Sequence, residues 1–165
     1  MRDRGEILTV RYDARAGRPG RVIVARLKPG SDLLKSLQNI ASKEEIEAGV
    51  ILSGVGLLGE ARLRNCKSLP EAFPITDANR TYLSFRRPLE VLSLSGNISR
   101  AEGTPLVHAH ATLSYVEGDV ITVVGGHLLP GCTVFGFAEV ILMALEGVEM
   151  EKRFDEETRT LQLFA

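Results

Sequence analysis

The sequence predicts an α+β fold in which a largely antiparallel β-sheet carries one main helix. Short segments rich in Val, Ile, Leu and Thr recur along most of the chain, and short turns join most of them, which is typical of antiparallel strands. Only one segment has apolar residues at helical spacing. Runs of strands with a lone helix favour α+β over alternating parallel units. Because 165 residues with 44% hydrophobic content can bury a core, we expect one domain over residues 1–165.

The first elements are two strands and the helix. Residues 7–12 alternate in polarity and residues 21–27 are rich in β-branched side chains, while residues 13–20 form the loop between them. Ser31 is a good N-cap, because it precedes apolar residues at helical spacing and follows a Pro-Gly pair. We expect the helix to run to about residue 48, where Gly49 would end it.

Strands dominate the rest of the chain. Two of them are separated by a loop over residues 70–78, and the last pair meets at a hairpin turn over residues 155–158. After the helix, residues 50–58 with 61–66 are expected to form one strand region broken by glycines. The further strands expected are residues 82–85, 89–98, 105–116, 119–128, 133–145 and 161–164.

All three histidines of the chain lie within one pair of expected strands. His108 and His110 belong to residues 105–116, and His127 belongs to residues 119–128. Histidine is the commonest side-chain metal ligand in proteins. Three of them in one segment indicate a site rather than scatter.

The register of that pair decides whether the rings meet. If Glu117-Gly118 is the two-residue turn, His108 lies directly opposite His127, and His110 points to the same face. Opposed Cβ atoms are about 4.5–5.5 Å apart and diagonal ones about 7–8 Å, a span that imidazoles can close around one ion. A bulge would shift the register by one residue and turn His127 away.

The donor set predicts the kind of metal. Three neutral imidazoles without a carboxylate suit zinc, and suit Ni, Co or Fe less well. Three protein ligands also leave a position for water or substrate, as in catalytic sites. Cys132 is the one candidate for a fourth, structural ligand. The alternative is that these are strand histidines hydrogen-bonded near a core.

Glu139 stands inside the apolar segment 135–142, where an acid costs free energy unless it is paired or hydrogen-bonded. It is either a structural partner at an interface or a helper of the metal site. In the second case it would accept a hydrogen bond from a ligating imidazole or act as a general base. Glu139 is therefore the candidate catalytic residue.

Composition limits the partners and the compartment. With 20 basic and 21 acidic residues, a net charge of −1, no Trp and 5% aromatics, the chain is unlike a free-standing nucleic-acid binder, although a local basic stripe stays open. Cys66 and Cys132 are too few for a disulfide scaffold, so we expect a reducing cytoplasm. Residues 1–10 lack the apolar core of a secretory signal, and no apolar run reaches the ~18 residues of a membrane span.

Three short motifs favour other functions weakly. Residues 54–59 match Gly-x-Gly-x-x-Gly, but no βαβ unit follows, so close packing in a strand explains them better than a dinucleotide. Residues 17–19 (Gly-Arg-Pro) resemble an AT-hook core, but Ala16 replaces its first arginine. His-x-His also begins the cupin motif, in which Tyr115 would have to be Glu.

Four segments together resemble the PPC domain, the plant and prokaryote conserved domain. They are residues 88–98, 106–114, 123–128 and 138–141. The resemblance covers nearly the whole chain and implies an antiparallel α+β protein that assembles as a homotrimer. Stand-alone prokaryotic members carry His-x-His and Gly-Gly-His, so the resemblance places His108, His110 and His127 as ligands of a divalent metal, with zinc expected. In plants the domain accompanies AT-hooks in DNA-binding proteins.

These observations lead to three hypotheses. The first is a metal-dependent enzyme or small-molecule binder, in which the ion polarises a substrate oxygen or lowers the pKa of bound water. The second is a DNA-binding or regulatory protein, as in the plant members. The third is a metal-stabilised trimeric scaffold without catalysis. The sequence names no substrate or reaction, so it leaves open whether the protein is an enzyme.

Overall fold

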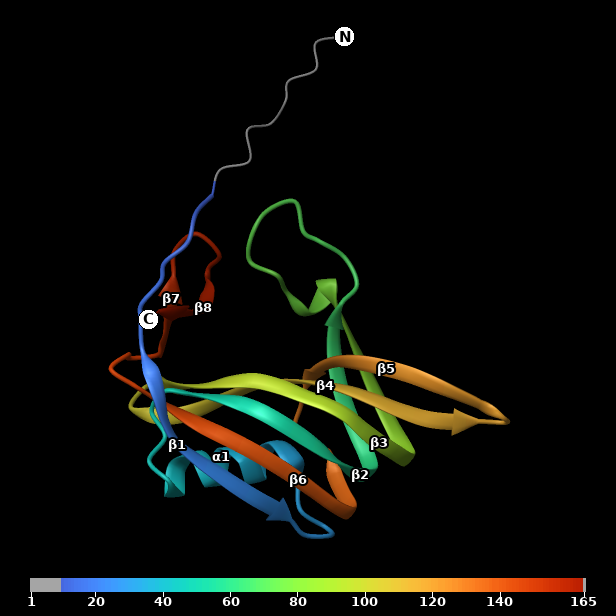
Figure 1. Ribbon diagram of the computed structural model, residues 1–165. Helices are drawn as coiled ribbons and strands as arrows, with labels where there is room; N and C mark the ends of the chain where they lie inside the picture. Colours follow the sequence, from blue (N-terminus) through green and yellow to red (C-terminus); the bar gives the residue numbers. More distant parts are fainter. Residues whose placement is uncertain (1–9, 165) are drawn as a thin grey trace.

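The computed structural model describes residues 10–164, and in these residues eight strands form one sheet with one α-helix (Figure 1). The predicted α+β fold with a largely antiparallel sheet is confirmed. In chain order the elements are β1 (Arg18–Leu27), α1 (Leu33–Lys43), β2 (Gly49–Cys66), the 3-10 turn η1 (Asp77–Asn79), β3 (Arg80–Ala101), β4 (Thr104–Glu117), β5 (Val120–Leu128), β6 (Thr133–Glu146), β7 (Glu151–Asp155) and β8 (Thr160–Phe164).

The sheet closes partly on itself. Its strand order is β1-β6-β2-β5-β4-β3-β7-β8, and β2 also pairs with β3. Because β2 pairs with both β5 and β3, the strands β2, β5, β4 and β3 form a ring. All these pairings are antiparallel, whereas β7 joins β3 through one parallel bridge between Arg100 and Glu151. The β7–β8 hairpin is thereby attached to the edge of the sheet.

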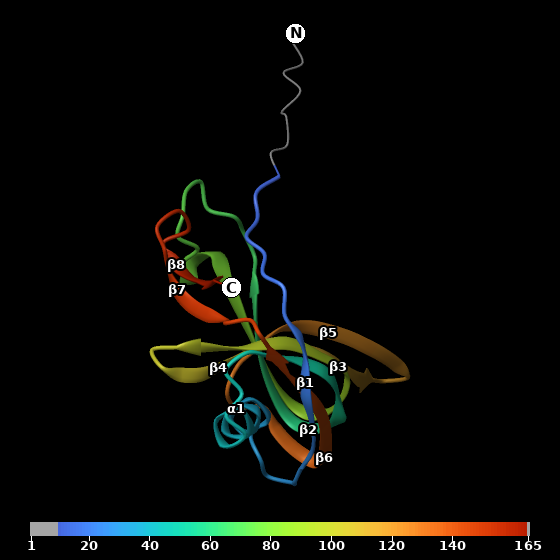
Figure 2. The ribbon, with the colours of Figure 1, turned by 60° about the vertical axis from the view of Figure 1, so that its left-hand side comes forward.

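The core lies between the sheet and α1. Leu33, Leu37 and Ala41 recur along one side of α1 and are all buried, as an amphipathic helix requires. The Gln38 side chain ties α1 to β4, because its Oε1 accepts a hydrogen bond from the Val107 amide at 3.0 Å. Helix α1 covers one face of the sheet, and the β7–β8 hairpin and the loop after β2 rise on the opposite side (Figures 1 and 2).

The ends of α1 differ from the prediction. Asp32, not Ser31, is the N-cap, and its carboxylate accepts a hydrogen bond from the Lys35 amide at 2.9 Å. The helix ends at Lys43 rather than near residue 48, because Glu45 adopts a φ of 52° that a helix does not allow. No helix in residues 10–164 is long and apolar enough to cross a membrane.

The N-terminal prediction was partly wrong. Of the expected strand 7–12, residues 7–9 lie outside the described residues, and residues 10–12 are not in a strand. The expected loop over residues 13–20 ends early, because β1 already begins at Arg18, which pairs with Glu146 of β6.

Regions that were predicted to be interrupted are continuous in the structure. Residues 50–58 and 61–66 form the single strand β2, which contains bulges where the glycines lie, and β3 likewise joins two predicted strands. Gly56 shows why these glycines are needed, since a Cβ there would lie 2.5 Å from the Phe137 carbonyl oxygen of β6. Within the Gly-x-Gly-x-x-Gly pattern, Gly54 and Gly56 therefore serve strand packing, as predicted.

Candidate metal centre

The hairpin of β4 and β5 turns one residue later than predicted. Glu117 pairs with Val120, so the two turn residues are Gly118 and Asp119. Gly118 has a φ of 62°, the positive φ at the first turn position that a Gly-X hairpin turn requires.

This turn changes which histidines are opposed but not the face on which they lie. His127 pairs with His110 rather than with His108, a shift of two residues. A shift by an even number of residues leaves every side chain on its original face. The ring centroids are 5.3 Å apart for His108 and His110, 4.9 Å for His108 and His127, and 5.2 Å for His110 and His127. The three rings therefore converge as expected.

The histidines offer a donor set that fits zinc. One ligand atom from each ring lies within 4.8 Å of the others. Nitrogens bound tetrahedrally to zinc at about 2.0–2.1 Å are roughly 3.4 Å apart, so small rotations of the rings would complete the site. The site lies on the sheet face away from α1, since the alternate residues of β4, such as Val107 and Ala109, point into the core.

An unpaired polar atom lies at the neighbouring position of the sheet. Asn97 of β3 pairs directly with His108. Its Oδ1 is buried and makes no hydrogen bond with any described residue. Ligating imidazoles usually donate their second ring N–H to such an acceptor. Asn97 is therefore placed where it can orient His108.

The surroundings keep two of the imidazoles neutral. Burial, and next to it the charge of Arg64, lowers the pKa of His127 from 6.5 to about 4. Burial also lowers the pKa of His108, with the charge of Lys152 as the second cause. A metal binds only the neutral imidazole, so at neutral pH protons compete little for these ligands.

The histidines line a hollow of about 410 Å³ that opens between the loop after β2 and the β7–β8 hairpin. The strands contribute cations, the loop contributes apolar side chains, and the hairpin contributes mainly hydroxyl and amide groups. Besides the three histidines, the lining residues are Arg64, Asn65, Cys66, Phe73, Ile75, Arg80, Lys152, Thr158, Thr160, Leu161 and Gln162.

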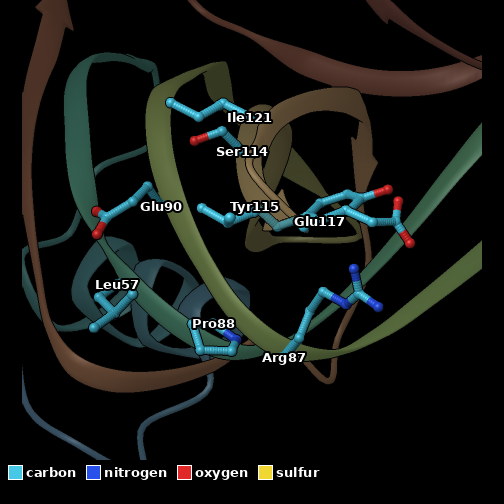
Figure 3. A pocket seen from close by; sticks show the side chains of 10 residues that line it. Leu57, Arg87, Pro88, Glu90, Ser114, Tyr115, Glu117 and Ile121 are labelled. Carbon is cyan, nitrogen blue, oxygen red and sulfur yellow. The ribbon is translucent and has the colours of Figure 1, made fainter.

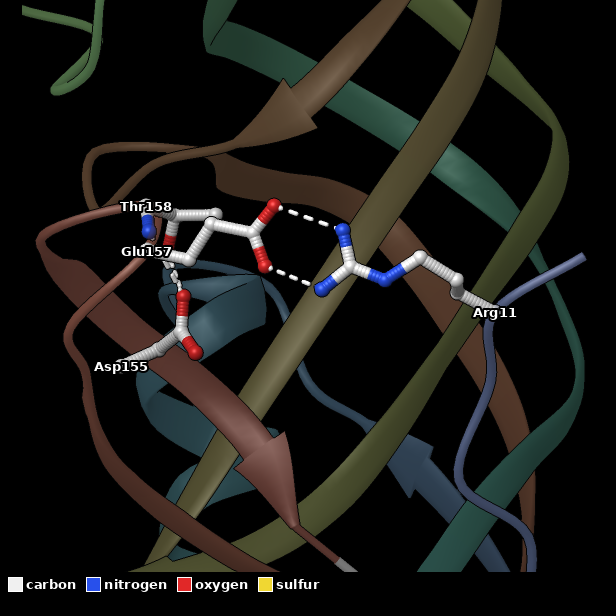
Figure 4. Close-up of polar contacts among 4 residues, drawn as sticks. All are labelled: Arg11, Asp155, Glu157 and Thr158. Atoms are coloured by element: carbon white, nitrogen blue, oxygen red, sulfur yellow. Dashed lines mark hydrogen bonds and ion pairs between the residues drawn. The ribbon is translucent and has the colours of Figure 1, made fainter. Parts of the chain in front are cut away.

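The β7–β8 hairpin makes polar contacts with the stretch before β1 and within its own turn. The Arg11 guanidinium donates two hydrogen bonds to the Glu157 carboxylate, at 3.0 and 2.7 Å, and so joins the stretch before β1 to the hairpin (Figure 4). Within the turn, Asp155 accepts hydrogen bonds from the Thr158 amide and hydroxyl at 2.7 and 2.6 Å. Because the ion pair is exposed, the contacts within the turn contribute more to the shape of the hairpin wall of the hollow.

Residues 14–146 match the model of a protein family, the Plants and Prokaryotes Conserved (PCC) domain. The chain belongs to the PCC domain family. The predicted resemblance is thereby confirmed, since PCC and PPC denote the same plant and prokaryote domain. The β7–β8 hairpin, and with it one wall of the hollow, lies beyond the matched residues.

Two solved structures are similar over almost the whole chain. A metal-containing protein of Archaeoglobus fulgidus is 28% identical with a TM-score of 0.76, covering 93% of this chain and 100% of that chain. A PPC protein of Pyrococcus horikoshii is 31% identical with a TM-score of 0.74, covering 91% of this chain and 96% of that chain.

Curated relatives are much longer than this chain. A bifunctional GlmU protein of Synechococcus sp. (strain JA-3-3Ab) is 34% identical over 157 residues, which is 91% of this chain and 22% of that protein. A GlmU protein of Synechococcus sp. (strain JA-2-3B'a(2-13)) is also 34% identical, over 138 residues. The chain spans about a fifth of the length of these relatives.

Two residues considered for the candidate metal site lie away from the three histidines. Glu139 is exposed on β6, opposite Arg26 of β1, and belongs neither to the histidine group nor to the lining of the hollow. An exposed carboxylate avoids the desolvation that made it conspicuous in the sequence. Cys132 is buried; its sulfur accepts a hydrogen bond from the Arg62 amide at 3.2 Å, and burial raises the pKa of its thiol. Neither residue is brought to the histidines.

A larger hollow lies at the far end of the β4–β5 hairpin. Its volume is about 680 Å³, and in it the Arg87 guanidinium lies over the Tyr115 ring, 4.6 Å from the centroid (Figure 3). Glu90 and Glu117 also line it, but it has no histidine or cysteine. Among residues 10–164, the hollow of about 410 Å³ holds the metal-ligand set, and it is therefore the candidate site.

Proposed function

We propose that this PCC-domain protein binds one divalent metal ion, zinc, through His108, His110 and His127, and uses it on a small-molecule ligand as an enzyme or a binder. The convergence of the three ligand atoms within 4.8 Å carries the proposal. The metal-containing relative from Archaeoglobus fulgidus supports it. Cys66 and Cys132 are both free thiols, which supports our expectation of a reducing cytoplasm.

The lining of the hollow suggests a role for each group of residues in binding the metal and the ligand. A bound divalent ion would supply Lewis-acid polarisation of a ligand oxygen. The strands hold the three imidazoles, and Asn97 orients His108. No Asp or Glu among residues 10–164 lines the hollow, which favours ligand binding and polarisation over proton abstraction by a carboxylate.

Metal analysis of the purified protein tests the proposal. After dialysis we expect about one zinc per wild-type chain and a loss of most of it in His127→Ala. Thr112→Ala is the matched control, because Thr112 lies on β4 at the same face as His110 but outside the histidine group. Unchanged zinc in His127→Ala, or equal loss in Thr112→Ala, contradicts the assignment.

We also propose that the protein assembles as a homotrimer, which the family resemblance implies. Large apolar side chains are exposed on the outer face of β1, β6 and β2, where water contact is unfavourable. We define the outer apolar face as Val24, Leu52, Val55, Phe135 and Phe137. Under the scaffold alternative, chelation of the metal would dissolve the trimer, whereas a trimer that survives chelation favours a ligand-binding role for the metal.

A further inference from the structure

The histidine hollow is lined by cations on more than one side. Arg64 of β2 pairs directly with His127, and Arg80 begins β3 on the neighbouring part of the rim. Lys152 reaches the hollow from β7. All three residues are half-buried, so their charges are less hydrated than those of ordinary surface residues.

Two of these cations have no acidic partner among the residues that the structure describes. Arg80 pairs with Asp77 at 3.1 Å. Within residues 10–164, Arg64 and Lys152 form neither an ion pair within 4.0 Å nor a side-chain hydrogen bond. Half-burial of an unpaired charge costs free energy, which a bound counter-charge offsets. The absence of Asp and Glu from the described lining leaves that role to a ligand.

The remaining walls restrict the ligand further. Thr158, Thr160 and Gln162 form a polar wall, in which the Gln162 amide donates hydrogen bonds to both hydroxyls at 3.2 and 2.9 Å. Phe73 and Leu161 supply apolar surface. A volume of about 410 Å³ suits a small molecule. The chemistry is that of a compact ligand with one charged end and a partly polar body.

We propose that the hollow binds a small organic anion, a carboxylate or a phosphate monoester, whose charged group lies between Arg64, Lys152 and the histidines. This inference rests on the proposed function for the presence of the metal, whose positive charge would strengthen anion binding. The two cations belong to the chain itself. They therefore bind the anion, more weakly, in metal-free protein as well.

Titrations followed by NMR of ¹⁵N-labelled protein test the inference, with and without zinc. Acetate and methyl phosphate are the anionic probes, and acetamide is the uncharged analogue of acetate. Both anions should shift the amide signals of Thr158, Thr160 and Gln162, and acetamide should not. Lys152→Gln and Arg64→Gln should each weaken binding roughly tenfold, as expected for loss of one charge-assisted hydrogen bond.

Two control variants separate the effect of charge on anion affinity from an effect on folding. Lys152→Arg should keep most of the affinity, and Lys28→Gln, at an exposed position after β1, should change nothing. Comparing acetate with methyl phosphate identifies which kind of anion the hollow prefers. Wild-type affinity in both Lys152→Gln and Arg64→Gln, or equal binding of acetamide, overturns the inference.

Two outcomes distinguish the anion site from the metal proposal and from nucleic-acid binding. Anion binding that depends on Lys152 in a protein that takes up no zinc supports the anion site and refutes the metal proposal. A duplex DNA that displaces both probes and loses affinity steeply with salt overturns the small-anion assignment in favour of nucleic acid.

Discussion

Arg64 on β2 lies directly opposite His127 on β5, and His127 in turn lies opposite His110 on β4. A permanent cation and two proposed metal ligands therefore occupy one row across three neighbouring strands. Directly opposed Cβ atoms are about 4.5–5.5 Å apart, so the guanidinium acts on His127 at close range. This row places Arg64, one of the cations of the hollow, beside the proposed metal ligands.

Removing the charge of Arg64 should raise the pKa of His127 in metal-free protein. In Arg64→Gln the pKa should rise from about 4 but stay below 6.5, because burial is the larger cause of its shift. NMR titration of the histidine ring signals measures it directly. Arg87→Gln is the control, since Arg87 lies over Tyr115 at the other hollow. An unchanged His127 pKa in Arg64→Gln would show that the two groups are not coupled.

The stability of metal-free protein should fall on acidification through a defined range. The pKa of His127 is about 4 when folded and 6.5 ordinarily, so the unfolded chain binds this proton more readily. The free energy of unfolding is then fully retained above pH 6.5 and decreases as the pH falls toward 4. Thermal unfolding between these values measures the slope.

His127→Gln, which cannot titrate, is the control for this range. Its melting temperature should depend less on pH than that of the wild type between the two pKa values. Asp77 and Asp155, whose pKa values are lowered by hydrogen bonds, lose their contribution only below their ordinary pKa of 3.8, outside this range. Identical slopes in both proteins would contradict the assignment.

The sequence predicted the strands and the histidine face because both follow from local patterns. The alternation of polar and apolar residues determined which side chains share a face. The predicted turn was wrong by one residue, which changed the partner of His127 by two residues and therefore left His127 on the same face. Bulged strands were the harder case. Glycines at residues 54–59 divided the predicted strand region 50–66, although β2 runs through them and Gly56 packs closely against β6.

The cations of the hollow were missed for a different reason. Lys152 approaches His108 only because the parallel bridge between Arg100 and Glu151 brings β7 beside β3. Arg64 faces His127 through the pairing of β2 with β5. Both contacts join residues far apart in the sequence, so no local motif predicts them. Glu139 was conspicuous for the opposite reason, because an apolar segment was assumed to be buried on both faces.

The glycines of β2 provide a matched test of packing. Gly56→Ala should destabilise the protein by about 1–3 kcal/mol, because its Cβ would lie 2.5 Å from a backbone oxygen of β6. Gly59→Ala should be tolerated, since its Cβ would meet Phe135 at an ordinary 3.6 Å. Chemical unfolding of both variants gives the comparison. Equal destabilisation would mean that close approach is not why β2 carries glycine.

The outer apolar face should determine the oligomeric state. Phe137 is 46% exposed there, and Phe137→Ser should shift a trimer toward monomer by removing apolar area from the contact. Phe154→Ser is the matched control, because Phe154 is 56% exposed on β7, away from that face. Sedimentation velocity over a range of concentrations measures the distribution. A wild-type monomer at all concentrations would refute the trimer. Dissociation of the Phe154→Ser variant alone would instead place the contact on the β7–β8 hairpin, beside the mouth of the histidine hollow.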